Sequence, residues 1–301
     1  MTTPEAGTGL ITSAGGFVAA SQTVGLAGQA LALQQVLSDV SAVTVQQLVE
    51  FFTQYDSEHP EFPTLLRRVL PVVLEQNATA AAAIAARWYD ELAPESEFTA
   101  TPVVNLNPIQ IDKTINWALY APGKAEPVDR LAGASKRIVA NAARDTITDN
   151  ANVEGVRWAR YASANACAFC RLLATRGPIY HTERSAKFVV GRAKGLTREQ
   201  RRERAAARMA GRPDPFVPVE YTGRTRGKRA LGEKYHDHCR CVPVPVRSGE
   251  DYNPPDYVQQ WEEEYVAAVK ETKRQGKTLG EYGAIDVKAV VAHMRANSDA
   301  R

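Results

Sequence analysis

All four cysteines of this 301-residue chain lie in two short clusters, a Cys-x-x-Cys pair and a Cys-x-Cys pair. The first pair is Cys167 and Cys170, and the second is Cys239 and Cys241, with His236 three residues before Cys239. A tetrahedral Zn²⁺ site takes four sulfur or nitrogen ligands, usually two from each of two segments. The spacing therefore predicts a structural zinc site that closes a loop of about seventy residues.

The identity of the four ligands is open at this point. The simplest set is Cys167, Cys170, Cys239 and Cys241. His236 or His238 can replace one of the two distal cysteines, because imidazole nitrogen is also a good zinc ligand. Four protein ligands leave no free coordination position, so we expect the centre to hold a loop-rich segment together and not to catalyse a reaction.

Other interpretations of the same residues remain. The thiols can be buried structural cysteines, or a Cys–His pair can act as a nucleophile and its base. An HNH-type nuclease fits less well, because it needs further metal ligands on a later helix and only His293 follows the cluster. No G-x-S-x-G, H-E-x-x-H, P-loop or G-x-G-x-x-G motif occurs in the sequence. The pattern thus favours a binding protein over an enzyme.

The charge is unevenly distributed, although the net charge is only +3. Residues 1–160 hold 11 Lys and Arg against 17 Asp and Glu, a net charge of −6. Residues 181–240 hold 16 against 7, a net charge of +9. A polyanion would therefore bind the middle of the chain and not its beginning.

The basic segment at residues 192–229 contains one predicted helix, which a capping box at residues 197–200 would begin. The arginines that this helix would present to phosphates are Arg198, Arg201, Arg202, Arg204 and Arg208. The alternative is a solvated face or a contact with an acidic partner. Few aromatic residues interrupt the segment, so base stacking has no support.

Hydrophobic periodicity predicts a mainly α protein. We expect helices through most of residues 27–160, with a break at residues 59–63 and a kink or end at Pro71. The connector at 95–128 should hold one short helix near 112–119, and further helices should cover 129–150 and 153–164. Val-Pro-Val-Pro-Val at 242–246 reads as an edge strand, and residues 255–275 and 284–296 as two terminal helices.

These elements suggest four parts of the chain. Residues 1–26 would form a flexible or partner-docked arm, and residues 27–155 a helical N-terminal domain. Residues 156–250 would form a small, loop-rich α+β zinc-binding domain that carries the basic insert, followed by C-terminal helices at 251–301. The apolar stretch at 10–33 is too interrupted for a membrane span, and the first basic residue is Arg67, so a secretory signal is not expected. A reducing compartment favours metal binding over a disulfide.

Several stretches resemble the Mu F-like minor head proteins of tailed bacteriophages, in particular the type found in phages of actinobacteria. They are Ala-Arg-Trp-Tyr-Asp-Glu-Leu at 86–92, Gly-Val-Arg-Trp-Ala-Arg at 155–160, the Cys-x-x-Cys stretch at 167–180, and Tyr-His-Asp-His-Cys-Arg-Cys at 235–241. The likeness runs from about residue 27 to residue 246. In that pattern His236, Cys239 and Cys241 lie opposite Cys167 and Cys170, which leaves five candidates for four positions.

The resemblance implies a virion component that acts in head assembly. Its expected partners are the portal protein, the major capsid protein and the incoming phage DNA, which it would bind without sequence specificity. Its location would be the capsid interior or the portal region, and the host cytoplasm during assembly. The helical domain would dock on a partner through the apolar Ala-rich faces left after its own packing. The resemblance also admits a capsid maturation protease or a transient assembly factor.

Overall fold

The computed structural model describes residues 25–123, 125–178, 203, 239–247, 252–279 and 284–297, and these are mainly helical, as the sequence predicted. The helices are α1 (Leu26–Gln54), α2 (Phe62–Glu91), α3 (Pro108–Tyr120), α4 (Pro127–Glu154), α5 (Ala168–Ala174), α8 (Tyr257–Arg274) and α9 (Val287–Asn297). The strands are β1 (Arg157–Tyr161), β2 (Val242–Val246), β3 (Thr278–Leu279) and β4 (Ala284–Ile285). The two predicted terminal helices are confirmed as α8 and α9, and the short connector helix as α3.

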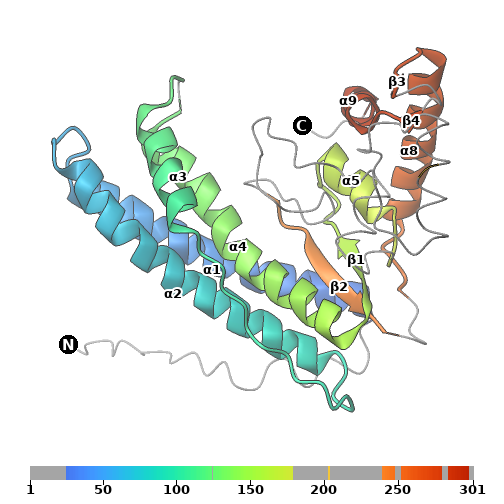
Figure 1. The fold of residues 1–301 in the computed structure, drawn as a ribbon, viewed down its shortest axis with the longest axis horizontal. Coiled ribbons are helices and arrows are strands. Elements are labelled where there is room, and N and C mark those ends of the chain that lie inside the picture. Colours follow the sequence, from blue (N-terminus) through green and yellow to red (C-terminus); the bar gives the residue numbers. More distant parts are fainter. Residues whose placement is uncertain are drawn as a thin grey trace, which may run out of the picture.

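Three long helices form a bundle, with α3 lying along α2 and α4 (Figure 1). Helices α1, α2 and α4 have 29, 30 and 28 residues, so each is roughly 45 Å long. The Ala-rich face of α2 is buried inside this bundle, where Ala78 and Ala82 pack against Ala142 of α4. Part of the Ala-rich surface of α2 is therefore used within the chain, and docking of a partner on the apolar faces left after this packing stays a prediction. Small side chains are used here to let two helices of the same chain approach closely.

Helix α2 continues through Pro71, so of the two predicted outcomes, a kink or an end of the helix, the end is excluded. Proline removes one backbone hydrogen bond, whereas the neighbouring Leu66, Leu70 and Leu74 bury their side chains completely or nearly so. The free energy gained by burying three leucine side chains outweighs the loss of one backbone hydrogen bond. Helix α2 is long and apolar enough for a membrane span, because an 18-residue window of it has a mean hydropathy of 1.4. In this fold, however, α2 packs against α1, α3 and α4.

Residues 153–164 do not form the expected helix. Helix α4 ends at Gly155, which has a left-handed conformation (φ 79°, ψ 18°), and Val156 donates its N–H to the carbonyl of Ala151 at 2.9 Å. Glycine adopts this conformation without a side-chain penalty, and it closes the helix end. The chain then continues as strand β1. Its residues Trp158 and Arg160, which are two positions apart, are both buried. Gly155 was the sequence signal for this helix end.

Strand β1 pairs with β2 in an antiparallel ladder that runs from Arg157 opposite Val246 to Tyr161 opposite Val242. The predicted edge strand is thus confirmed as β2. All five of its residues are buried, and it packs on α4 and α1. The predicted domain boundary at 155 coincides with the end of α4, yet one hydrophobic cluster extends from Leu33 of α1 to Met294 of α9. The bundle and the C-terminal elements therefore share a core.

A buried ion pair joins the end of β2 to the bundle. Arg247 donates to both carboxylate oxygens of Glu154, at 2.8 and 3.1 Å, and its guanidinium lies 4.9 Å from the ring centre of Tyr89. The hydroxyl of Tyr89 donates to the same carboxylate. Burial and this hydrogen bond raise the pKa of Tyr89 above its usual range. The two charged side chains are only 13 and 14% exposed, so each depends on the other.

We expect Glu154→Ala to lower the free energy of unfolding by about 3 kcal/mol, because the substitution leaves a largely buried guanidinium without its counter-charge. Urea denaturation followed by circular dichroism measures this loss. Glu91→Ala is the matched control, because it breaks the exposed pair with Arg87 and should cost less than about 1 kcal/mol. Equal, small losses in the two variants would contradict a structural role for the Glu154 pair.

Candidate metal centre

Two chain segments bring the cysteines to one place. Cys167 is the residue before α5 and Cys170 lies in its first turn, so the two share one side of the helix. Cys239 and Cys241 belong to the segment that leads directly into β2. Because Tyr161 of β1 pairs with Val242, the ladder places the start of β2 beside the turn that precedes α5. Strand pairing thus sets the relative position of the two cysteine pairs.

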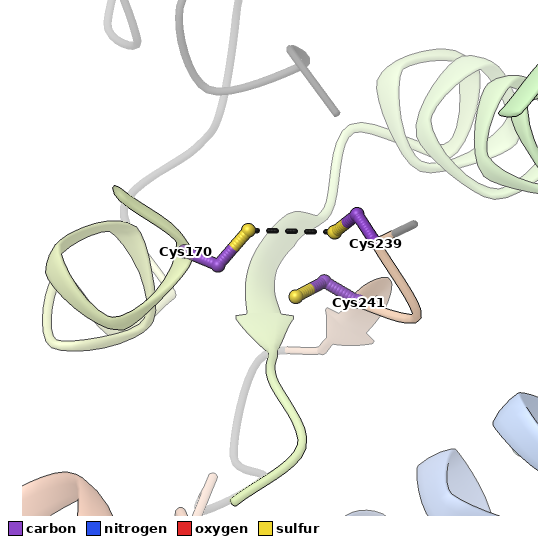
Figure 2. Close-up of side chains that lie close together, drawn as sticks. All are labelled: Cys170, Cys239 and Cys241. Carbon is purple, nitrogen blue, oxygen red and sulfur yellow. Dashed lines mark hydrogen bonds between the residues drawn. The ribbon is translucent and has the colours of Figure 1, made fainter. Parts of the chain in front are cut away.

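Three of the thiols form a tight cluster. The sulfur atoms of Cys170, Cys239 and Cys241 all lie within 4.8 Å of one another. Figure 2 shows Cys170 reaching from α5 toward the other two, and its sulfur lies 3.3 Å from that of Cys239. Cys167 is exposed, hydrogen-bonds to Cys170 and lines the same pocket as the other three cysteines. The simplest predicted set therefore gathers around one pocket.

The arrangement fits a metal ion better than a disulfide. All four cysteines are free thiols, and 3.3 Å is well beyond the S–S bond of about 2.05 Å. Four sulfurs bound at about 2.3 Å to one tetrahedral ion lie roughly 3.8 Å apart. Shifts of well under 1 Å would bring Cys170 and Cys239 to that spacing. Three cysteines are thus close enough to hold a metal ion together, and Cys167 lines the same pocket.

Two of the thiols lie in a buried, apolar environment. Cys170 and Cys241 are each 1% exposed and pack with Val258 and Trp261 of α8. Hydrogen bonds from Cys170 and Cys241, with the positive charges of Arg144 and Arg160, lower the pKa of the Cys239 thiol far below its usual range. The thiolate is the form that binds metal. The site therefore favours the ligand form of at least one cysteine.

Two buried arginines support the cluster, and neither was identified from the sequence. Arg144 of α4 donates to the carbonyl of Cys241 at 2.9 Å and to the carbonyl of Cys239. Arg160 of β1 lies with its Nη1 atom 3.9 Å from the sulfur of Cys170. They are 2 and 0% exposed. A divalent ion with four thiolates carries a charge of −2, which these two guanidinium groups would balance.

The remaining predicted site residues lie outside the described residues. His236 and His238 precede the first described residue of the second cluster. The arginines of the predicted basic helix, Arg198, Arg201, Arg202, Arg204 and Arg208, also fall there. Their roles as an alternative metal ligand and as phosphate contacts therefore stay predictions.

Comparison with known proteins gives one match. A family model described as VG15 protein matches residues 27–193 and 218–268, which include all four cysteines and His236. The gap between the two matched stretches contains the predicted basic helix. No curated protein and no solved structure matches the chain.

We expect Cys239→Ser to abolish metal binding and to unfold the region beyond residue 165, because ligand loss removes the link between the two segments. The α1–α4 bundle should remain folded. Metal content by mass spectrometry, together with limited proteolysis and circular dichroism, measures both effects. Ser163→Ala is the control, because Ser163 lines the same pocket without offering a thiol. A Cys239 variant that is indistinguishable from the wild type would exclude a structural metal centre.

We also expect Arg144→Met to weaken metal binding by about 10- to 100-fold, because groups that orient the ligands commonly have effects of this size. Competition with a chromophoric chelator measures the affinity, and the absorption of the Co²⁺-substituted protein reports the ligand geometry. Arg68→Met, on the exposed surface of α2, is the matched control and should leave both unchanged. An unaltered metal affinity in the Arg144 variant would show that the guanidinium of Arg144 does not contribute to metal binding.

Proposed function

This chain belongs to the VG15 family of phage proteins, and we propose that it is a minor capsid protein that acts in head assembly. The observation that carries the proposal is the family match over most of the chain. The finer assignment draws on the resemblance to Mu F-like minor head proteins. It remains a proposal, as do the partners and the place in the virion.

The fold supports the proposal because two of the stretches that carry the resemblance, 86–92 and 155–160, contribute to the same core where the bundle meets β1. Trp88 and Tyr89 of α2 are buried beside the end of α4, and Tyr89 contacts Glu154. Trp158 of β1 is buried in the same core cluster as Trp88. Residues that are distant in the sequence thus form one end of the bundle, which joins the helical part to the cysteine-bearing part.

Zinc is the metal that this donor set would hold best. Four soft thiolates suit a tetrahedral Zn²⁺ ion, which has no redox chemistry and no geometric demand of its own. Cys167, Cys170, Cys239 and Cys241 would hold the ion, with His236 as an alternative fourth ligand. The two buried arginines favour the four-thiolate set, because a set of three thiolates and one neutral imidazole would leave one positive charge unbalanced. The ion would supply a covalent-like link between the two segments and would leave no position for substrate.

Helix α3 offers a face for contact with the portal or the capsid. Ile109, Trp117 and Tyr120 are 67, 48 and 65% exposed. Their spacing of eight and three residues places them along one side of the helix. Exposed aromatic side chains are enriched in protein interfaces. In this proposal α3 meets the protein shell, and the basic middle of the chain faces the packaged DNA.

Quantitative mass spectrometry of mature particles and empty procapsids tests the proposal. We expect the intact chain in both, at a small and constant copy number, because a structural component stays in the particle. Particles assembled with Trp117→Ala and Tyr120→Ala should contain less of the chain, since the docking face is removed. Val153→Ala, an equally exposed apolar residue at the end of α4, is the control.

The contrary result would be a chain that is present in procapsids but absent or truncated in mature particles. That outcome would favour a maturation protease or a transient assembly factor. Unprocessed capsid subunits in particles made with a cysteine variant that still folds would point to the protease.

A further inference from the structure

A second pocket lies between α1, α4 and the segment that leads into β2. It is lined on one side by Gln34 and Ser38 of α1, and on the other by Lys136 and Arg144 of α4. Arg240, between the two cysteines of the second pair, completes it. Its volume is about 150 Å³. At roughly 10–15 Å³ of such volume for one water molecule, the pocket has room for a phosphate group, which has five heavy atoms.

The pocket is strongly positive. Lys136, Arg144 and Arg240 line it together with Cys239, and none of its described lining residues is an aspartate or a glutamate. Arg144 is close enough to Cys239 to help lower the pKa of that thiol, so its charge is partly balanced there. Within the described ranges, neither Lys136 nor Arg240 forms an ion pair. An anion bound in the pocket would be attracted by these two unbalanced cations.

The pocket also offers hydrogen-bond donors. Gln34 is 4% exposed, and its Nε2 atom has no acceptor among the residues that the structure describes. A buried amide hydrogen without an acceptor destabilises the fold, so an acceptor here would be favourable. The guanidinium of Arg144, which donates to the carbonyls of Cys239 and Cys241 and to the side chain of Asn141, also lines the pocket.

We infer that this pocket binds a phosphate group. Two lining cations without an ion pair, an amide donor and the absence of aspartate and glutamate from the described lining together suit a compact, multiply charged oxyanion with several acceptor atoms. The phosphate can be free inorganic phosphate or a phosphodiester of the DNA backbone. The site is distinct from the basic segment at 192–229, and it does not depend on the proposed role in head assembly.

Isothermal titration calorimetry with the metal-loaded full chain tests the inference. Inorganic phosphate is titrated in a buffer without other oxyanions, against sodium chloride at matched ionic strength. We expect saturable binding of phosphate that Lys136→Gln and Arg240→Gln each weaken by about tenfold, because each removes one charge-assisted hydrogen bond. Lys113→Gln on α3 removes an equal charge away from the pocket and should leave the affinity unchanged.

A fluorescein-labelled 12-nucleotide single strand distinguishes the two sources of phosphate. If Lys136→Gln weakens the binding of both ligands and phosphate displaces the strand, the pocket takes a backbone phosphodiester. If the variant weakens phosphate binding alone, the pocket takes the free ion. The inference is overturned if phosphate gives no more heat than chloride, or if both variants bind it as the wild type does. Metal content and circular dichroism of each variant, measured in parallel, show whether the fold and the centre are intact.

Discussion

A guanidinium group that is buried in a protein needs both hydrogen-bond acceptors and negative charge, and Arg144 obtains both from one short segment. It donates to the carbonyls of Cys239 and Cys241, and its positive charge helps to lower the pKa of the Cys239 thiol, which can supply the negative charge as a thiolate. The long helix α4 therefore carries a fixed anchor for a segment that lies 95 residues later in the chain. The pairing of β1 with β2, the approach of α5 and the convergence of the cysteines all follow from where that segment is held.

The same anchor explains why the cysteine-bearing part shares a hydrophobic core with the bundle. Val242 and Val244 of β2 lie in the core cluster that includes Leu33 of α1. Arg247, at the other end of the strand, is tied to Glu154 and Tyr89. A five-residue strand is thus fastened to the bundle at both ends, by a charge–carbonyl contact and by an ion pair. Its two prolines forgo backbone hydrogen bonds, and burial against the bundle compensates for the loss.

Features that depend on local pattern were predictable from the sequence. Helical spacing of apolar residues located the bundle, and the alternating valines located β2. The cysteine spacing predicted that thiols from the two pairs would meet, and those of Cys170, Cys239 and Cys241 do. Strand β1 was not predicted, since residues 153–164 have helical character and only Gly155 ends the helix. Arg144 could not be identified either, because a buried cation is recognised only when its distant partners are known. The fate of the Ala-rich face depended in the same way on the position of α4.

The nearness of Cys170 to Cys239 has a consequence for the divergence of the family. Everything between these residues forms a closed loop whose ends are held at 3.3 Å. The cost of closing such a loop grows only slowly with its length, by about 0.6 kcal/mol for each doubling. A metal crosslink there would lower the conformational entropy of the unfolded chain as a disulfide does. For a loop of this size, that would stabilise the folded state by about 4 kcal/mol. Insertions can therefore accumulate between the two cysteine pairs at little cost to the shared core, and residues 194–217, which the family model leaves unmatched, lie in that loop.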